Sequence, residues 1–188
     1  MSVFVADALL HRRFALLNLG VSAANKLGPR ARPCSIPLPA GMPRPPAPPV
    51  TLPALLKWIE ENEDIELHWS QNARGIRYMW DHGADVGIIV TPCHLQHHPM
   101  ECVDHLAHEI LHHYSLRRNA GGNRWLRGLT SGRNESVAQK MQCAFLLPLN
   151  EIVGLTVEEV SDRWHILPHR AECALRLVWE YDTCHQPR

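Results

Sequence analysis

The feature that most constrains this chain is a helix-forming stretch at residues 99–115 that carries two paired histidines. Apolar residues recur there at relative positions 0, +3, +4, +7 and +11, which places them on one face of an α-helix. These residues are Val103, Leu106, Ala107, Ile110 and Tyr114. On the same helical wheel, His108 and His112 lie on roughly the opposite side. The pattern predicts a helix that turns one face to the core and two imidazoles to a cleft.

The two histidines frame an HExxH motif, His108-Glu109-Ile110-Leu111-His112. Side chains four residues apart on a helix sit one above the other, so both imidazoles can reach one ion. Glu109 lies one step round the helix, where it can take a proton from a water molecule that attacks a peptide carbonyl. Two histidines and a carboxylate leave a coordination position open, as catalysis requires. The motif therefore predicts one zinc ion per chain, with Glu109 as general base.

The third protein ligand must come from elsewhere in the chain. Glu135 is well placed, because it follows His112 by 23 residues and starts the next predicted helix, behind a glycine-containing connection. His105 lies about 10.5 Å along the helix from His112, which is too far for one ion to bridge. His113 points elsewhere on the wheel. Three histidines precede the helix and could fold back, although no spacing favours them: His94, His97 and His98. We expect these five histidines to lie on the surface or around the ligands.

One acid on the same helix has two interpretations. Asp104 lies four residues before His108, a spacing at which its carboxylate could orient that imidazole. An ordinary acid on a solvated helix surface would have the same spacing, and this is the interpretation we expect.

Around this helix the sequence predicts an α+β fold. A turn at residues 81–84 indicates that the second and third strands form a hairpin, and Thr156 with Glu159 forms a capping box. The predicted elements are helices near residues 52–59, 99–115, 134–147, 157–164 and 168–181, and strands at Ile65–Ser70, Gly75–Trp80 and Asp85–Thr91. This order predicts a short mixed or antiparallel sheet packed on helices.

The first 50 residues differ from the rest of the chain. They hold six basic residues against one acid, and eight of the 17 residues from Pro33 to Pro49 are proline. Such a segment favours extended polyproline-like structure. We therefore expect residues 1–50 to be a disordered leader and linker that packs no core, and residues 51–188 to form the domain. The abrupt change in composition also allows a native start at Met42.

A second motif follows the HExxH helix and has the form Glu-x-x-Ala-x-x-x-x-x-x-Leu-Leu-x-Pro. Its positions are Glu135, Ala138, Phe145, Leu146 and Pro148, with Phe145 at the first leucine position. Together the two motifs resemble the ImmA/IrrE-type zinc metallopeptidases. The resemblance covers residues 51–188 and implies a small zincin-like metallopeptidase domain. It also implies that zinc is bound by His108, His112 and Glu135, and that Glu109 is the general base.

The resemblance further implies a zinc-dependent endopeptidase of the cytoplasm that cuts a regulatory protein, a helix-turn-helix transcriptional repressor, and so controls stress-response genes. The alternative is a non-catalytic, metal-stabilised interaction module that binds a repressor or another partner. The 19 basic and 19 acidic residues balance, which argues against direct nucleic-acid binding. No apolar run approaches the roughly 18–20 residues that a membrane helix needs. None of the six cysteines is spaced as CxxC, and we expect free thiols.

The chain departs from the family pattern at several positions. Leu111 stands where the family often has glycine, and Gln139 and Met141-Gln142 replace the usual Asn and Phe-Ala. We expect these differences to affect substrate fit more than zinc binding. Candidates for the group that stabilises the oxyanion are Tyr78, His82 and Tyr114.

Overall fold

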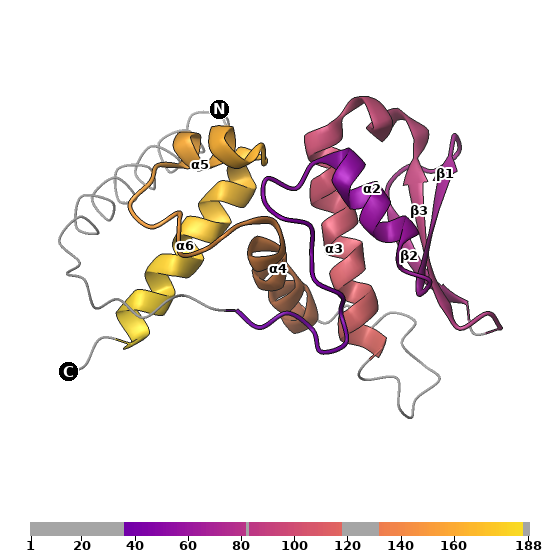
Figure 1. Cartoon of the computed structure of the whole chain (residues 1–188), viewed down its shortest axis with the longest axis horizontal. Coiled ribbons are helices and arrows are strands. Elements are labelled where there is room, and N and C mark those ends of the chain that lie inside the picture. Colours follow the sequence, from indigo (N-terminus) through magenta and orange to yellow (C-terminus); the bar gives the residue numbers. More distant parts are fainter. Residues whose placement is uncertain (1–35, 82, 118–131, 186–188) are drawn as a thin grey trace, which may run out of the picture.

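The computed structural model describes residues 36–81, 83–117 and 132–185 (Figure 1). Its elements are α2 (Leu52–Glu60), β1 (Ile65–Ser70), β2 (Arg77–Asp81), β3 (Val86–Pro92), the short 3-10 helix η1 (Cys93–His97), α3 (Pro99–Arg117), α4 (Gly132–Leu146), α5 (Val157–Trp164) and α6 (Pro168–His185). None of the described helices is both long and apolar enough to cross a membrane. Every predicted helix and strand is present, and η1 is an addition.

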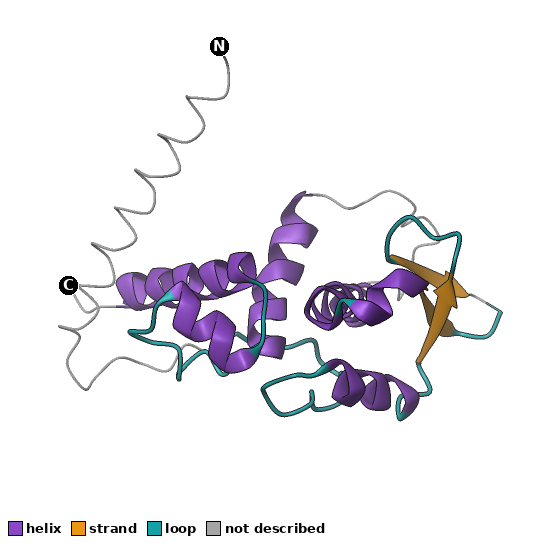
Figure 2. Ribbon diagram, turned by 90° about the horizontal axis from the view of Figure 1, so that it is seen from above, coloured by secondary structure: helices purple, strands orange, loops and turns teal. Residues whose placement is uncertain are grey.

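The three strands form one mixed sheet in the order β1-β3-β2. Strand β1 is parallel to β3, with Ile65 opposite Gly87, and β2 is antiparallel to β3, with Arg77 opposite Val90. The predicted hairpin is therefore confirmed, as is the α+β fold with a short mixed sheet. Figures 1 and 2 show the sheet at one end of the molecule and the α5–α6 pair at the other, with α3 and α4 between them.

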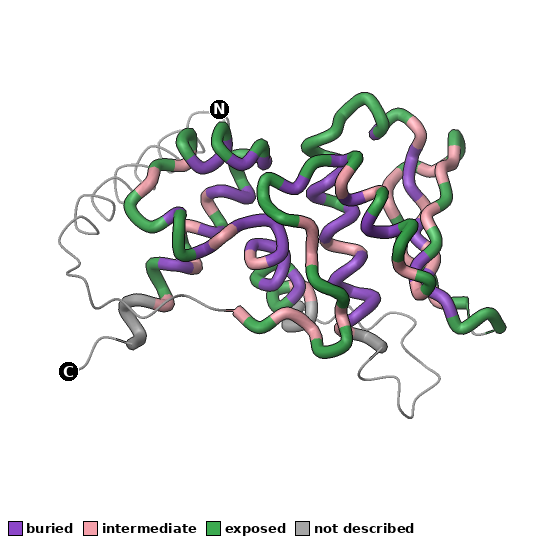
Figure 3. The backbone as a smooth tube through the Cα atoms, viewed as in Figure 1, coloured by how far each residue is buried: buried purple, intermediate pink, exposed green. Residues whose placement is uncertain are grey.

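Helix α3 is the centre of the structure and is buried around most of its circumference (Figure 3). It packs against β2 and β3 on one side, against α4 on another, and also against α2. The predicted apolar face is confirmed, since its five members are all at most 4% exposed. The prediction was incomplete, however, because Cys102, Leu111 and His113 are fully buried as well. Leu111 belongs to the hydrophobic core cluster rather than to the surface of a cleft.

His113 holds α3 against the sheet. Its side chain is fully buried, its Nδ1 lies 3.1 Å from the hydroxyl of Tyr78, and its ring stacks on Trp80 at 5.5 Å between centroids. The ring lies directly over Gly87 of β3, where a Cβ atom would overlap Nδ1 of His113 and lie 2.9 Å from Cε2 of Tyr78. Glycine is therefore required at this position because the helix approaches the strand so closely.

Replacing Gly87 with alanine should destabilise the fold by about 1–3 kcal/mol, because the new methyl group would enter a packed region in which the imidazole of His113 has no room to move. Chemical denaturation would measure the loss. Gly75→Ala is the matched control, since nothing lies within 4 Å of a Cβ atom there, and it should change stability by less than about 0.5 kcal/mol. Equal stability of the two variants would contradict the close-approach argument.

The segment before α2 packs against the folded domain. Ile36, Leu38 and Met42 are partly buried against the core cluster, and Val50 is a buried member of it. The indole Nε1 of Trp58 donates a hydrogen bond of 2.8 Å to the backbone carbonyl of Arg44. Our expectation that residues 1–50 pack no core is therefore corrected for residues 36–50. Residues 1–35 lie outside the described part of the chain, and the domain boundary near residue 50 stays a prediction.

Side-chain caps set the start of two short helices, and the cap of the second one was predicted from the sequence. The side chain of Thr51 accepts a hydrogen bond of 3.4 Å from the backbone amide of Ala54 at the start of α2. At the start of α5, both halves of the predicted capping box between Thr156 and Glu159 are present. These caps satisfy backbone amides that have no partner within the helix.

Candidate metal centre

Helices α3 and α4 bring three sequence-predicted side chains together. The Nε2 atoms of His108 and His112 lie 3.0 Å apart. One carboxylate oxygen of Glu135 lies 3.2 Å from Nε2 of His108, and the other lies 3.2 Å from Nε2 of His112. One ligand atom from each of the three residues lies within 4.8 Å of the others, so the group could hold a metal ion.

The position of Glu135 follows from its place in α4. It lies in the first turn of that helix, where the positive end of the helix dipole favours an acid. Because α4 packs along α3, this first turn comes to lie beside the HExxH turn. The imidazole of His112 is 11% exposed and the carboxylate of Glu135 is 34% exposed, so the group is shielded in part but is still reached by solvent.

The donor atoms of the cluster suit a metal ion. Burial lowers the pKa of His112, the neighbouring imidazole of His108 lowers it further, and the carboxylate of Glu135 opposes both effects. A neutral imidazole is the form that binds a metal, so a lowered pKa keeps His112 competent as a ligand near neutral pH. Two imidazole nitrogens and a carboxylate also match the donor types that transition metals such as zinc prefer.

Glu109 lies beside the cluster and is partly buried. Burial raises the pKa of its carboxyl group to about 7, and the negative charge of Glu135 contributes to the increase. The effect of Glu135 means that the two carboxylates are close enough to repel each other. A divalent cation held by the cluster would reduce that repulsion and favour the charged form of Glu109.

The other histidines are not part of this group. His105 is exposed and lies 3.9 Å from the carboxylate of Glu101. The histidines of η1 and its C-cap, His94, His97 and His98, are also exposed. Within residues 36–81, 83–117 and 132–185, His108, His112 and Glu135 are the one group with suitable geometry for a metal. We expected His113 near the surface or around the ligands, and it is instead buried under the sheet.

Asp104 is a buried acid and not the ordinary surface acid that we expected. It is 5% exposed, and its carboxylate oxygens lie 2.7 Å from Nε and 3.1 Å from Nη2 of Arg170 on α6. Burial alone would lower the pKa of Arg170, but the hydrogen bonds and charge of Asp104 outweigh it and the pKa is raised. Both carboxylate oxygens of Asp104 therefore accept a hydrogen bond from the guanidinium, and Nε2 of His169 lies 3.6 Å from the same carboxylate.

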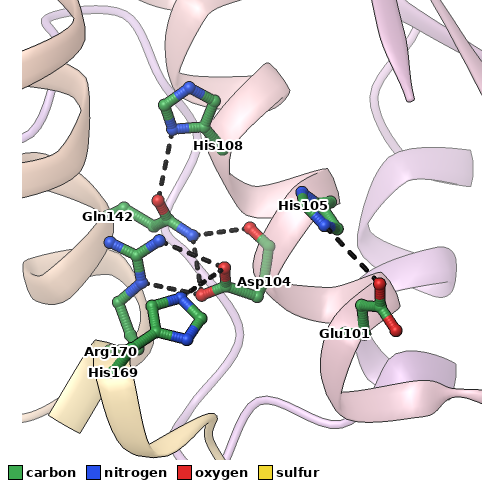
Figure 4. A network of polar contacts seen from close by, with 7 residues as sticks. All are labelled: Glu101, Asp104, His105, His108, Gln142, His169 and Arg170. Carbon is green, nitrogen blue, oxygen red and sulfur yellow. Dashed lines mark hydrogen bonds and ion pairs between the residues drawn. The ribbon is translucent and has the colours of Figure 1, made fainter. Parts of the chain in front are cut away.

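Gln142 is a residue near the site whose role our sequence analysis missed. It is fully buried on α4, and its side chain contacts both His108 and Asp104 (Figure 4). The sequence pattern indicates that Gln142 is buried, because position 142 falls on the same helix face as Ala138 and Phe145, which are buried. A glutamine on a buried face must find hydrogen-bond partners there.

Two of the three candidates for stabilising the oxyanion contact other aromatic side chains. The hydroxyl of Tyr78 meets His113, and Tyr114 packs edge-on against Trp58 at 6.4 Å between ring centroids. His82 lies outside the described residues.

The thiols of Cys102 and Cys143 are buried, and burial raises the pKa of each to about 11, so both stay protonated and are unsuited to bind a cation.

Comparisons with protein-family models, curated proteins and solved structures found no match to this chain.

Glu135→Gln should weaken binding of added zinc by more than the roughly tenfold to hundredfold loss typical of residues that only support a ligand, because it replaces a charged ligand atom with a neutral one. Elemental analysis after dialysis against a metal buffer would measure the bound metal. Glu101→Gln, which changes an acid on α3 outside the cluster, should keep wild-type metal content. Unchanged metal in Glu135→Gln would remove Glu135 from the ligand set.

Proposed function

We propose that this protein is a zinc-dependent endopeptidase that hydrolyses a peptide bond in a regulatory protein. The observation that carries the proposal is the convergence of two imidazoles from α3 and one carboxylate from α4. Catalytic zinc sites use three protein ligands of these types and keep a further position open for water or substrate. The cluster of His108, His112 and Glu135 has this composition, and its side chains are partly exposed to solvent.

The proposed chemistry divides between the metal and one side chain. Zinc supplies a Lewis acid that lowers the pKa of a water molecule and polarises a peptide carbonyl. Glu109 accepts the proton of the attacking water and then delivers it to the amine that leaves. The carboxylate of Glu109 suits this role because Glu109 is adjacent to His108 in the chain, and because its pKa is raised in part by the charge of Glu135, which indicates that it lies near the cluster.

The substrate class rests on the resemblance of the two motifs to ImmA/IrrE-type metallopeptidases. On that basis the proposed substrate is a helix-turn-helix transcriptional repressor in the cytoplasm. The order of HExxH helix and Glu-bearing helix supports this assignment, since α3 and α4 pack together as the two motifs require.

Glu109→Gln should abolish cleavage while zinc stays bound, because it removes the general base and keeps every metal ligand. The expected loss is about 10²–10⁴-fold in cleavage rate. The substitution should be tolerated by the fold, since burial already disfavours the charged form of this side chain. The assay would incubate the zinc-loaded protein with a degenerate peptide library and detect new N-termini by mass spectrometry.

The control for this experiment is Glu101→Gln, which should cleave at the wild-type rate. A Glu109→Gln protein that cleaves as fast as wild type would contradict the assigned role. Full regulatory activity of Glu109→Gln in cells would support the alternative, a metal-stabilised module that binds a repressor without cutting it.

A further inference from the structure

The side chain of Gln142 bridges two residues of α3 from its buried position on α4 (Figure 4). Its Oε1 lies 3.2 Å from Nδ1 of His108. Its Nε2 donates to the backbone carbonyl of Asp104 at 2.5 Å and to the carboxylate of Asp104 at 3.0 Å. A fully buried amide costs free energy unless its groups are hydrogen-bonded, and here both ends have partners.

The chemistry of Asp104 fixes which way this amide points. A backbone carbonyl only accepts hydrogen bonds, and an ionised carboxylate also only accepts. Both carboxylate oxygens of Asp104 already accept hydrogen bonds from the guanidinium of Arg170. The nitrogen end of Gln142 must therefore face Asp104, which leaves the oxygen end to face His108.

The orientation of Gln142 in turn fixes the proton of His108. An amide oxygen only accepts, so Nδ1 of His108 must carry a hydrogen atom to bond with it. In a neutral imidazole the other nitrogen, Nε2, then has a free lone pair. That Nε2 is the atom that faces Nε2 of His112 and the carboxylate of Glu135.

We propose that Gln142 is a positioning residue that holds the imidazole of His108 in the Nδ1–H tautomer. In this orientation, Nε2 of His108 points toward Nε2 of His112 and the carboxylate of Glu135. Asp104 and Arg170 act behind it by fixing the direction of the amide, so the start of α6 is linked to the metal centre. This inference rests on the metal site of the proposed function but not on peptide cleavage.

The first test is nitrogen NMR of ¹⁵N-histidine-labelled, metal-free protein at a pH where the imidazoles are neutral. Wild-type His108 should show a protonated Nδ1 and an unprotonated Nε2. Gln142→Met has similar volume but replaces the amide oxygen with a thioether sulfur, which is only a weak acceptor, and should shift His108 toward the Nε2–H tautomer. A wild-type protein in which His108 carries its proton on Nε2 would overturn the proposal, whether or not the variant folds.

The second test is competition for zinc between the protein and a chromophoric chelator. Gln142→Met should bind zinc roughly tenfold to hundredfold more weakly than wild type, the usual effect of removing a partner that orients a metal-binding histidine. Gln139→Met is the matched control, because Gln139 is exposed on the same helix, and it should change neither the tautomer nor the affinity. Wild-type affinity and an unchanged His108 tautomer in Gln142→Met would refute the role of Gln142. Because neither readout needs a substrate, failure of this inference is distinct from failure of the peptidase proposal.

Discussion

The structure depends on burying α3 around most of its circumference while one strip stays accessible. The sheet covers one side of this helix and α4 covers another, so different sides of α3 meet different neighbours. His108 lies on this accessible strip, and its partners on α4 are the polar side chains of Gln142 and Glu135. A central helix of this kind holds its side chains rigidly, which is what a metal centre requires of its ligands.

Polar contacts between distant segments complete this arrangement. Asp104 and Arg170 are separated by 66 residues in sequence, and both are almost fully buried. Removing Asp104 would leave the buried guanidinium of Arg170 without its carboxylate partner, a change that commonly costs about 3–5 kcal/mol. Gln142 joins the pair to His108, so α3, α4 and α6 share one network of polar groups.

The sequence was sufficient for features that depend on local periodicity. The histidine spacing, the start of the helix with Glu135 and the capping box of α5 each involve residues within one helix, and the structure has all three. Other features depend on which segments meet. Asp104 resembled a surface acid because nothing near it in sequence reveals Arg170, and His113 could be placed against the sheet only once Gly87 was known to be its neighbour there.

The candidate ligands come from two helices, and this has a consequence for the protein's lifetime in the cell. An ion shared by His108, His112 and Glu135 would act as a cross-link between α3 and α4, and its binding energy would add to the free energy of folding. Metal depletion would then loosen this helix pair and raise the population of open forms that cellular proteases attack. Abundance of the protein would consequently follow the supply of the ion.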